Sequence, residues 1–325
     1  MTNAVYSNAR ARSLEKSLLG AERINRMIDS GDPAEAMKIL AEVNFGGGIA
    51  VASANDFEIL TNAEEKNLIA FIKEACPSES LKAFLLKKYD YHNAEALIKS
   101  KYLKTDSEKF TVENGLLDKD EMREKIMSDD YRDFPEPMKK ALAECDAEFA
   151  ASKASGASIN AKFIKAFFAD MADIAKKNGK LSEIYKAKVD SANISTALRT
   201  RNFAVAKQDY LYGGTITLSE FKALNEEQFD VLKTKFRFSP RAEMAASAIK
   251  AAEKKIPLSE FEKEADEFAV SYLLRFRYAT EGVLPFMQYC FYKLADIANV
   301  RIIMVGLLNG FGDNIKSRLR TFYAG

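Results

Sequence analysis

Apolar residues recur at three- and four-residue spacing along nearly the whole chain, for example at Ile24, Met27 and Ile28. This spacing places apolar side chains on one face of a helix. Only two short stretches, residues 49–52 and 210–216, have a composition typical of strands. The pattern therefore predicts an all-α protein.

A proline-containing signal for the start of a helix occurs three times, at Asp32-Pro33, Phe134-Pro135 and Ser239-Pro240. Proline is favoured at the first position of a helix because its missing N–H would have no partner there. The three prolines are separated by 102 and 105 residues. Such regular spacing indicates an internal repeat.

A polar motif, Asp-x-x-Asn, recurs in the same register at residues 90–93, 190–193 and 296–299. Its aspartates follow the three prolines by 57, 55 and 56 residues. The ordinary role of such an aspartate is to cap the N-terminus of a helix, and we expect that role here.

Turn signals precede each motif, at residues 76–78, 178–179 and 281–282, and predict a helical hairpin in each copy. We therefore interpret the chain as three helical repeats of about four helices each. The repeats are expected at residues 1–113, 114–212 and 213–325. Three copies of one unit predict either a short solenoid or a pseudo-threefold ring.

Composition excludes several classes of function. The chain has 325 residues, with 48 Lys and Arg against 47 Asp and Glu, so it is not a strongly basic nucleic-acid binder. His92 is its only histidine, and copies two and three have Ala192 and Ala298 at that position, so a shared catalytic or zinc-binding histidine is excluded.

The three cysteines of the chain lack CxxC spacing and predict reduced thiols in a cytoplasmic protein. Apolar stretches are too short to span a bilayer, so a soluble protein is expected.

Basic residues follow the motif in each copy, and we interpret them as contacts for an elongated partner. A solvated face is the ordinary alternative for any one of these cations. The candidate partner interface consists of the motif asparagines and these cations: Asn93, Lys99, Lys101, Asn193, Arg199, Arg201, Asn299 and Arg301. Copy three lacks the cation pair of the other two copies.

The N-terminal stretch from Asn8 to Gly46, the three Asp-x-x-Asn helices and the ending NVRIIMVGLLNG…IKSRL resemble the C subunit of the V-type (A/V-type) ATP synthase. That family includes the d subunit of the vacuolar ATPase. The resemblance implies an all-helical funnel of three pseudo-threefold-related subdomains, with no cofactor and no catalytic activity. It implies a central-stalk component that connects the rotor shaft, made of D- and F-type subunits, to the membrane proteolipid ring. Such a component transmits torque for ion transport without binding nucleotide, and lies on the cytoplasmic side of the membrane.

Two other functions are compatible with parts of the sequence. Asp129, Asp130 and Asp133 form an Asp-Asp-x-x-Asp string like the one with which helical isoprenoid synthases hold Mg²⁺. The string runs directly into Pro135, which places it in a loop, and its acids are absent from the other copies.

The other alternative is a helical-repeat adaptor for a different assembly. No motif typical of a phosphate-binding loop is present, because the Gly46-Gly47-Gly48 run is not followed by Lys-Ser or Lys-Thr.

Overall fold

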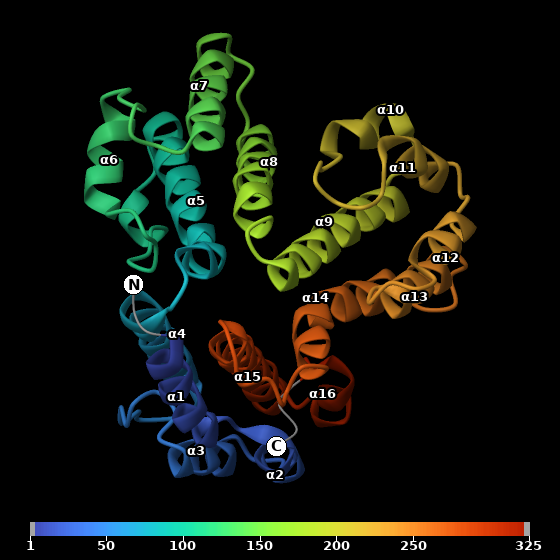
Figure 1. The fold of residues 1–325 in the computed structure, drawn as a ribbon. Coiled ribbons are helices and arrows are strands. Elements are labelled where there is room, and N and C mark those ends of the chain that lie inside the picture. Colours follow the sequence, from blue (N-terminus) through green and yellow to red (C-terminus); the bar gives the residue numbers. More distant parts are fainter. Residues whose placement is uncertain (1–3, 322–325) are drawn as a thin grey trace. The chain divides into compact units, whose positions relative to one another are not determined.

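The computed structural model describes residues 4–321, and helices are the only regular secondary structure within them (Figure 1). The all-α prediction is confirmed. Residues 49–52 and 210–216, the two stretches with a composition typical of strands, form loops. The first loop follows three glycines with positive φ, a backbone conformation that a strand does not use.

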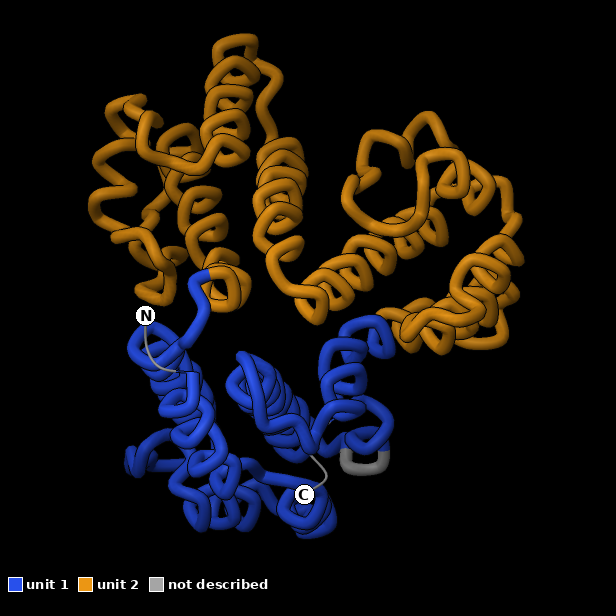
Figure 2. The backbone as a smooth tube through the Cα atoms, viewed as in Figure 1, with its two compact units in different colours: residues 1–79, 263–325 blue, residues 80–262 orange. Residues whose placement is uncertain are grey.

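The chain divides into two compact units (Figure 2). Unit 1 combines residues 1–79 with residues 263–325, and unit 2 consists of residues 80–262. The division into three repeats at residues 113 and 212 stays a prediction.

Unit 1 is built around one long helix, α15 (Leu284–Leu308), against which helices from both parts of the unit's sequence pack. Apolar residues of α15, such as Val300 and Ile303, join Ile24, Met27 and Leu40 in a fully buried cluster. The other elements are α1 (Ala4–Leu14), η1 (Glu15–Ser17), α2 (Gly20–Asp29), α3 (Pro33–Glu42), η2 (Ala54–Asp56), α4 (Phe57–Ala75) and α16 (Gly312–Arg318). Helix α14 (Leu258–Leu274) crosses the boundary between the units.

Unit 2 contains two further long helices, α5 (Glu79–Leu103) and α9 (Gly179–Arg199). Buried residues of α5, such as Leu97, form a core with Met122, Leu142 and Phe163 from the helices that follow. The remaining elements are η3 (Ser107–Lys109), α6 (Lys119–Met127), α7 (Glu136–Ala150), α8 (Gly156–Ala175), α10 (Phe203–Ala206), η4 (Lys207–Asp209), α11 (Leu218–Asn225), α12 (Asp230–Phe236) and α13 (Ala242–Ala252).

The predicted turns lie directly before the three long helices, but the aspartates do not cap them. Helices α5, α9 and α15 begin at residues 79, 179 and 284, about three turns before the motif. Helix α9, for example, is capped by Asn178, whose side chain accepts from the N–H groups of Lys180 and Leu181. The expectation that each motif aspartate starts a helix was therefore wrong, because the turn residues already start it.

No helix in the described part of the chain is both long enough and apolar enough to cross a membrane. The three cysteines are buried and form no disulfide.

Candidate functional site

The Asp-x-x-Asn motifs lie in the middle of α5, α9 and α15, which we call the motif helices. Their Asp and Asn side chains lie on one helix face, because residues three apart are neighbours there. All six are 2% exposed or less: Asp90, Asn93, Asp190, Asn193, Asp296 and Asn299. Polar side chains so deeply buried need internal partners.

Each motif asparagine binds both polar atoms of one backbone residue further along the chain. Its side-chain NH2 group donates to the carbonyl oxygen of that residue, and its Oδ1 accepts from the same residue's N–H, over distances of 2.7–3.1 Å. A side-chain amide carries the same donor and acceptor as a peptide group, so it replaces a backbone partner. The pairs are Asn93 with Val112, Asn193 with Leu211, and Asn299 with Arg320.

The motif aspartates hold the chain just before the next helix begins. Asp90 Oδ1 accepts from the N–H groups of Leu116 and Leu117 at 2.8 and 3.0 Å, directly before the N-cap of α6. Asp190 Oδ1 accepts in the same way from Thr215 and Ile216, at 2.7 and 3.0 Å, before the N-cap of α11. In these two copies, the aspartate and the asparagine therefore fix the loop between the motif helix and the helix that follows it.

The third motif is completed by the opposite end of the sequence. Asp296 Oδ2 accepts from the N–H of Leu19, 277 residues away, at 2.9 Å. Leu19 lies directly before α2, so α2 occupies for α15 the position that α6 and α11 occupy for their motif helices. Within unit 1, residues near the N-terminus thus complete the last motif.

A glycine lies beside each of the first two motif aspartates. A Cβ atom added at Gly115 or Gly214 would fall well inside van der Waals distance of Oδ1 of Asp90 or Asp190. Only a residue without a side chain lets the backbone pass so close to the carboxylate. Sequence reasoning missed these glycines, although both follow their aspartate by nearly the same interval, 25 and 24 residues.

Asp190 has a buried cationic partner that sequence reasoning also missed. The guanidinium of Arg241, 5% exposed, lies 2.5 Å from Asp190 Oδ2 and donates to the Thr215 hydroxyl at 2.6 Å. Burial raises the pKa of Asp190, while the two backbone N–H groups and Arg241 oppose the rise. Because Arg241 belongs to a later segment, no local pattern in the sequence indicates the pair.

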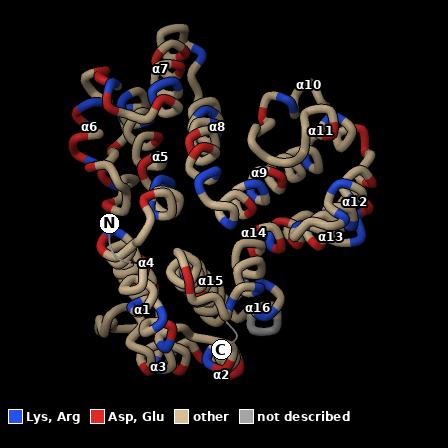
Figure 3. The backbone as a smooth tube through the Cα atoms, viewed as in Figure 1, with Lys and Arg blue, Asp and Glu red and all other residues tan. Residues whose placement is uncertain are grey.

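Each predicted interface cation is paired with a carboxylate of its own unit. Lys101 is largely buried, with 16% of its side chain exposed, whereas Arg199 is 62% exposed. The pairs are Lys99–Glu95, Lys101–Asp129, Arg199–Glu262, Arg201–Glu227 at 3.6 Å and Arg301–Glu65 at 3.1 Å. Opposite charges alternate along both units, which agrees with this internal pairing (Figure 3).

The Asp-Asp-x-x-Asp string is arranged for ion pairs rather than for a metal. Its three carboxylates turn to three different cations: Asp129 to Lys101, Asp130 to Arg132 and Asp133 to Lys125. The hydrogen bond from Lys101 lowers the pKa of Asp129. In residues 4–321, no group of three or more His, Cys, Asp and Glu side chains is placed to hold a metal ion.

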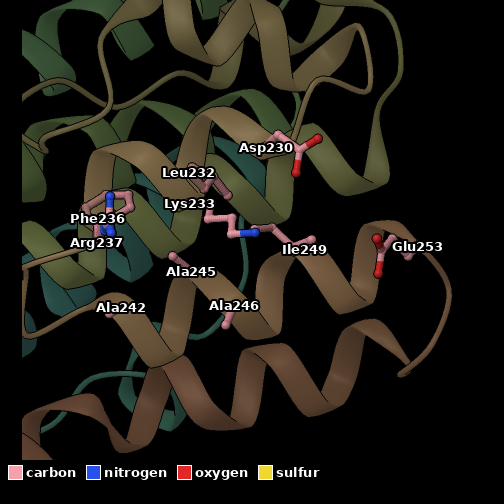
Figure 4. Close-up of a pocket in the computed structure, with 10 residues that line it drawn as sticks. All are labelled: Asp230, Leu232, Lys233, Phe236, Arg237, Ala242, Ala245, Ala246, Ile249 and Glu253. Carbon is pink, nitrogen blue, oxygen red and sulfur yellow. The ribbon is translucent and has the colours of Figure 1, made fainter.

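A groove of about 360 Å³ lies between α12 and α13 (Figure 4). Leu232, Phe236 and Ala245 form its buried floor, and Lys233 and Glu253 lie among its exposed lining residues. The charges of the lining have both signs, so the groove selects no particular charge of ligand.

The only histidine, His92, is exposed on α5, and its Nε2 lies 2.8 Å from the carbonyl oxygen of Phe110. That carbonyl is two residues before Val112, the residue bound by Asn93. His92 therefore contacts the loop of the first motif.

Comparison with known proteins agrees with this architecture. The model of the ATP synthase (C/AC39) subunit family matches residues 7–318. The chain is also similar to the C subunit of the V-type sodium ATPase of Enterococcus hirae, with 19% identity over 97% of this chain and 98% of that protein. With three motif helices in a helical chain that the family model matches almost throughout, the protein belongs to the ATP synthase (C/AC39) subunit family.

Proposed function

We propose that this protein is a non-catalytic central-stalk subunit of a V-type ATPase or ATP synthase. In this role it links the rotor shaft to the membrane proteolipid ring and transmits torque during ion transport. The observation that carries the proposal is the family match along residues 7–318. The bonding of the motifs supports it, because their carboxylates and amides bind the protein's own backbone and hold helices together, as a load-transmitting part requires.

The proposed partners are the D- and F-type shaft subunits on one side and the proteolipid ring on the other. The protein would lie at the cytoplasmic face of the membrane as a peripheral part of the complex. It would not bind nucleotide itself, because the catalytic subunits of such a machine perform ATP hydrolysis.

The proposed shaft contacts are the cations that follow the motifs, above all the exposed Arg199 and Arg201, with Arg301 and Lys99 at intermediate exposure. Lys101 contributes less in this proposal, because it is held by Asp129. The asparagines act indirectly, by fixing the motif helices that carry the cations.

The test is binding of the purified full-length chain to the purified shaft subunits. We expect co-elution in size-exclusion chromatography at micromolar concentrations. Folded proteins that elute separately would contradict the proposal. A folded chain that binds no shaft but captures an unrelated assembly would favour the adaptor function instead.

A charge-reversal pair refines the contact. Arg199→Glu is expected to slow association with the shaft several-fold and to reduce its salt dependence, because charges at the edge of an interface mainly act on the association rate. Lys176→Glu is the matched control, since Lys176 is 74% exposed, is also paired with one acid and lies in the same unit. Equal association rates for the two variants would show that Arg199 is not part of the contact with the shaft.

A further inference from the structure

The third motif differs from its sisters in how its aspartate is neutralised. Asp296 is fully buried in unit 1; its Oδ2 accepts from Leu19, and its Oδ1 has no hydrogen-bond partner in the described part of the chain. Asp190, by contrast, has two backbone donors and the guanidinium of Arg241. A buried carboxylate with a single donor is expensive to keep ionised.

Two charged side chains face Asp296. Lys293, one turn earlier on α15, is 3% exposed and forms an ion pair with Glu64 of α4, which is 7% exposed. Glu64 also accepts from the N–H of Gly46 at 2.8 Å, so its second oxygen is bound as well. Lys293 and Glu64 thus form a buried pair beside Asp296.

The segment between η1 and α2 contributes backbone atoms only: Ser17 O accepts from Lys293 at 3.3 Å, and Leu19 N donates to Asp296. Tyr289 of α15 is a further titratable neighbour, and burial raises its pKa well above the usual value. On α2, Arg23 donates to the carbonyl oxygen of Leu18 at 3.4 Å. Other charged side chains on the helices packed against α15 form ion pairs of their own: Arg10 with Glu74, Arg12 with Glu15, Arg26 with Glu42, Lys38 with Glu35 and Lys316 with Asp29.

Two carboxylates and one ammonium therefore share this buried site, which we call the closure cluster (Asp296, Glu64 and Lys293). When both acids are ionised, the cluster has an uncompensated negative charge, and burial makes such a charge costly. One bound proton makes the cluster neutral. Glu64 has an ion-pair partner and a backbone donor, whereas Asp296 has one backbone donor and an oxygen without a hydrogen-bond partner among the described residues, so we assign the proton to Asp296.

We propose that the closure cluster takes up one proton when the N-terminal segment docks against α15, so that closure of unit 1 becomes weaker as pH rises toward neutrality. The proton would reside on Asp296, whose Oδ1 has no hydrogen-bond partner among the described residues. Docking of residues 15–29 and protonation of Asp296 are then linked equilibria.

The direction of the pH dependence follows from the pKa of Asp296 in the folded and the unfolded protein. Burial raises the pKa of Asp296 from 3.8 to about 7 in the folded protein, with Glu64 adding to the rise and the Leu19 N–H and Lys293 opposing it. Between these values the folded state holds a proton that the unfolded chain lacks. The unfolding equilibrium constant is therefore expected to rise roughly tenfold per pH unit across this window, and to level off above pH 7.

The test uses the full chain. Carbon NMR of ¹³C-labelled aspartate side chains, with the Asp296 signal identified by its loss in Asp296→Asn, should show a carboxyl that titrates near pH 7. Hydrogen exchange of residues 15–29 across pH 5–8, corrected for intrinsic rates, should show opening that becomes more frequent with pH. Asp296→Asn keeps an acceptor for Leu19 and should remove this dependence, whereas Asp173→Asn, at an exposed and paired acid, should leave it unchanged.

A second variant decides the case even if Asp296→Asn fails to fold. Glu64→Gln removes the neighbouring negative charge and leaves Lys293, so the Asp296 titration should move to lower pH. An Asp296 carboxyl that titrates below pH 5 in the wild-type chain would overturn the proposal. A pH dependence that persists unchanged in a folded Asp296→Asn variant would also overturn it.

Discussion

Asp190 and Arg241 form an ion pair in which both side chains are almost fully buried, so loss of either partner is costly. Asp190→Ala should lower the free energy of unfolding by about 3–5 kcal/mol, since it removes the closest counter-ion of the buried guanidinium and leaves only Glu183, at 3.4 Å. Urea unfolding of unit 2 measures this change. Arg199→Ala is the control: its pair with Glu262 is exposed and should contribute about 0–1 kcal/mol. Similar losses for both variants would show that Arg241 relaxes into solvent.

Substitution of Gly115 and Gly214, the glycines beside two motif aspartates, tests how closely the loops must approach the motif helices. Gly115→Ala and Gly214→Ala should each destabilise the protein by about 1–3 kcal/mol, because the added Cβ displaces the carboxylate from its backbone donors. Gly179→Ala is the matched control, as nothing lies within 4 Å of an added Cβ there. It should be neutral or slightly stabilising by thermal unfolding. If all three variants lost stability equally, the loss at Gly115 and Gly214 could not be attributed to the contact between the added Cβ and the carboxylate.

At the scale of elements, the asparagines connect each motif helix to the loop that follows it. Asn193→Ala leaves both polar groups of Leu211 without their side-chain partner and should cost about 2 kcal/mol or more. The opening should be local, so limited proteolysis should cut within residues 207–217 before any other segment. Asn309→Ala, which removes only an exposed bond to the carbonyl of Val305, provides the comparison. An unchanged cleavage pattern would mean that other contacts hold the loop.

Sequence patterns predicted the elements better than they predicted what the motifs do. The three long helices and their starting turns follow from Asn178, Gly179 and similar local signals, which act within a few residues. The motifs act over 18–27 residues in unit 2, and over 277 residues between Leu19 and Asp296. The prediction that the aspartates cap helix N-termini was therefore wrong, because it considered only neighbouring residues. Glu95 lies one turn before Lys99 on the same helix, but the other carboxylate partners of the cations were equally hidden, because residues such as Glu262 come from other elements.

At the scale of the molecule, unit 2 is continuous in sequence, whereas unit 1 needs both ends of the chain. A fragment of residues 78–257 should therefore fold alone, because it contains the cores around α5 to α8 and around α9. Residues 1–77 and 258–325 should be largely unfolded when separate and gain helix when mixed, since α15 packs on α4. Circular dichroism of the separate and mixed fragments measures this, and a cooperative fold of residues 258–325 alone would contradict it.

The asparagines bind peptide groups and not side chains, and the residues they bind are as different as Val112, Leu211 and Arg320. The side chains of Val112 and Arg320 are only partly buried and can take other roles, as when Arg320 pairs with Asp266 at 3.0 Å, whereas Leu211 belongs to the core. Mutation can therefore change the chemistry of positions 112 and 320 without removing the bonds that attach these segments. Both positions are places where the surface properties of the protein can change at little cost in stability.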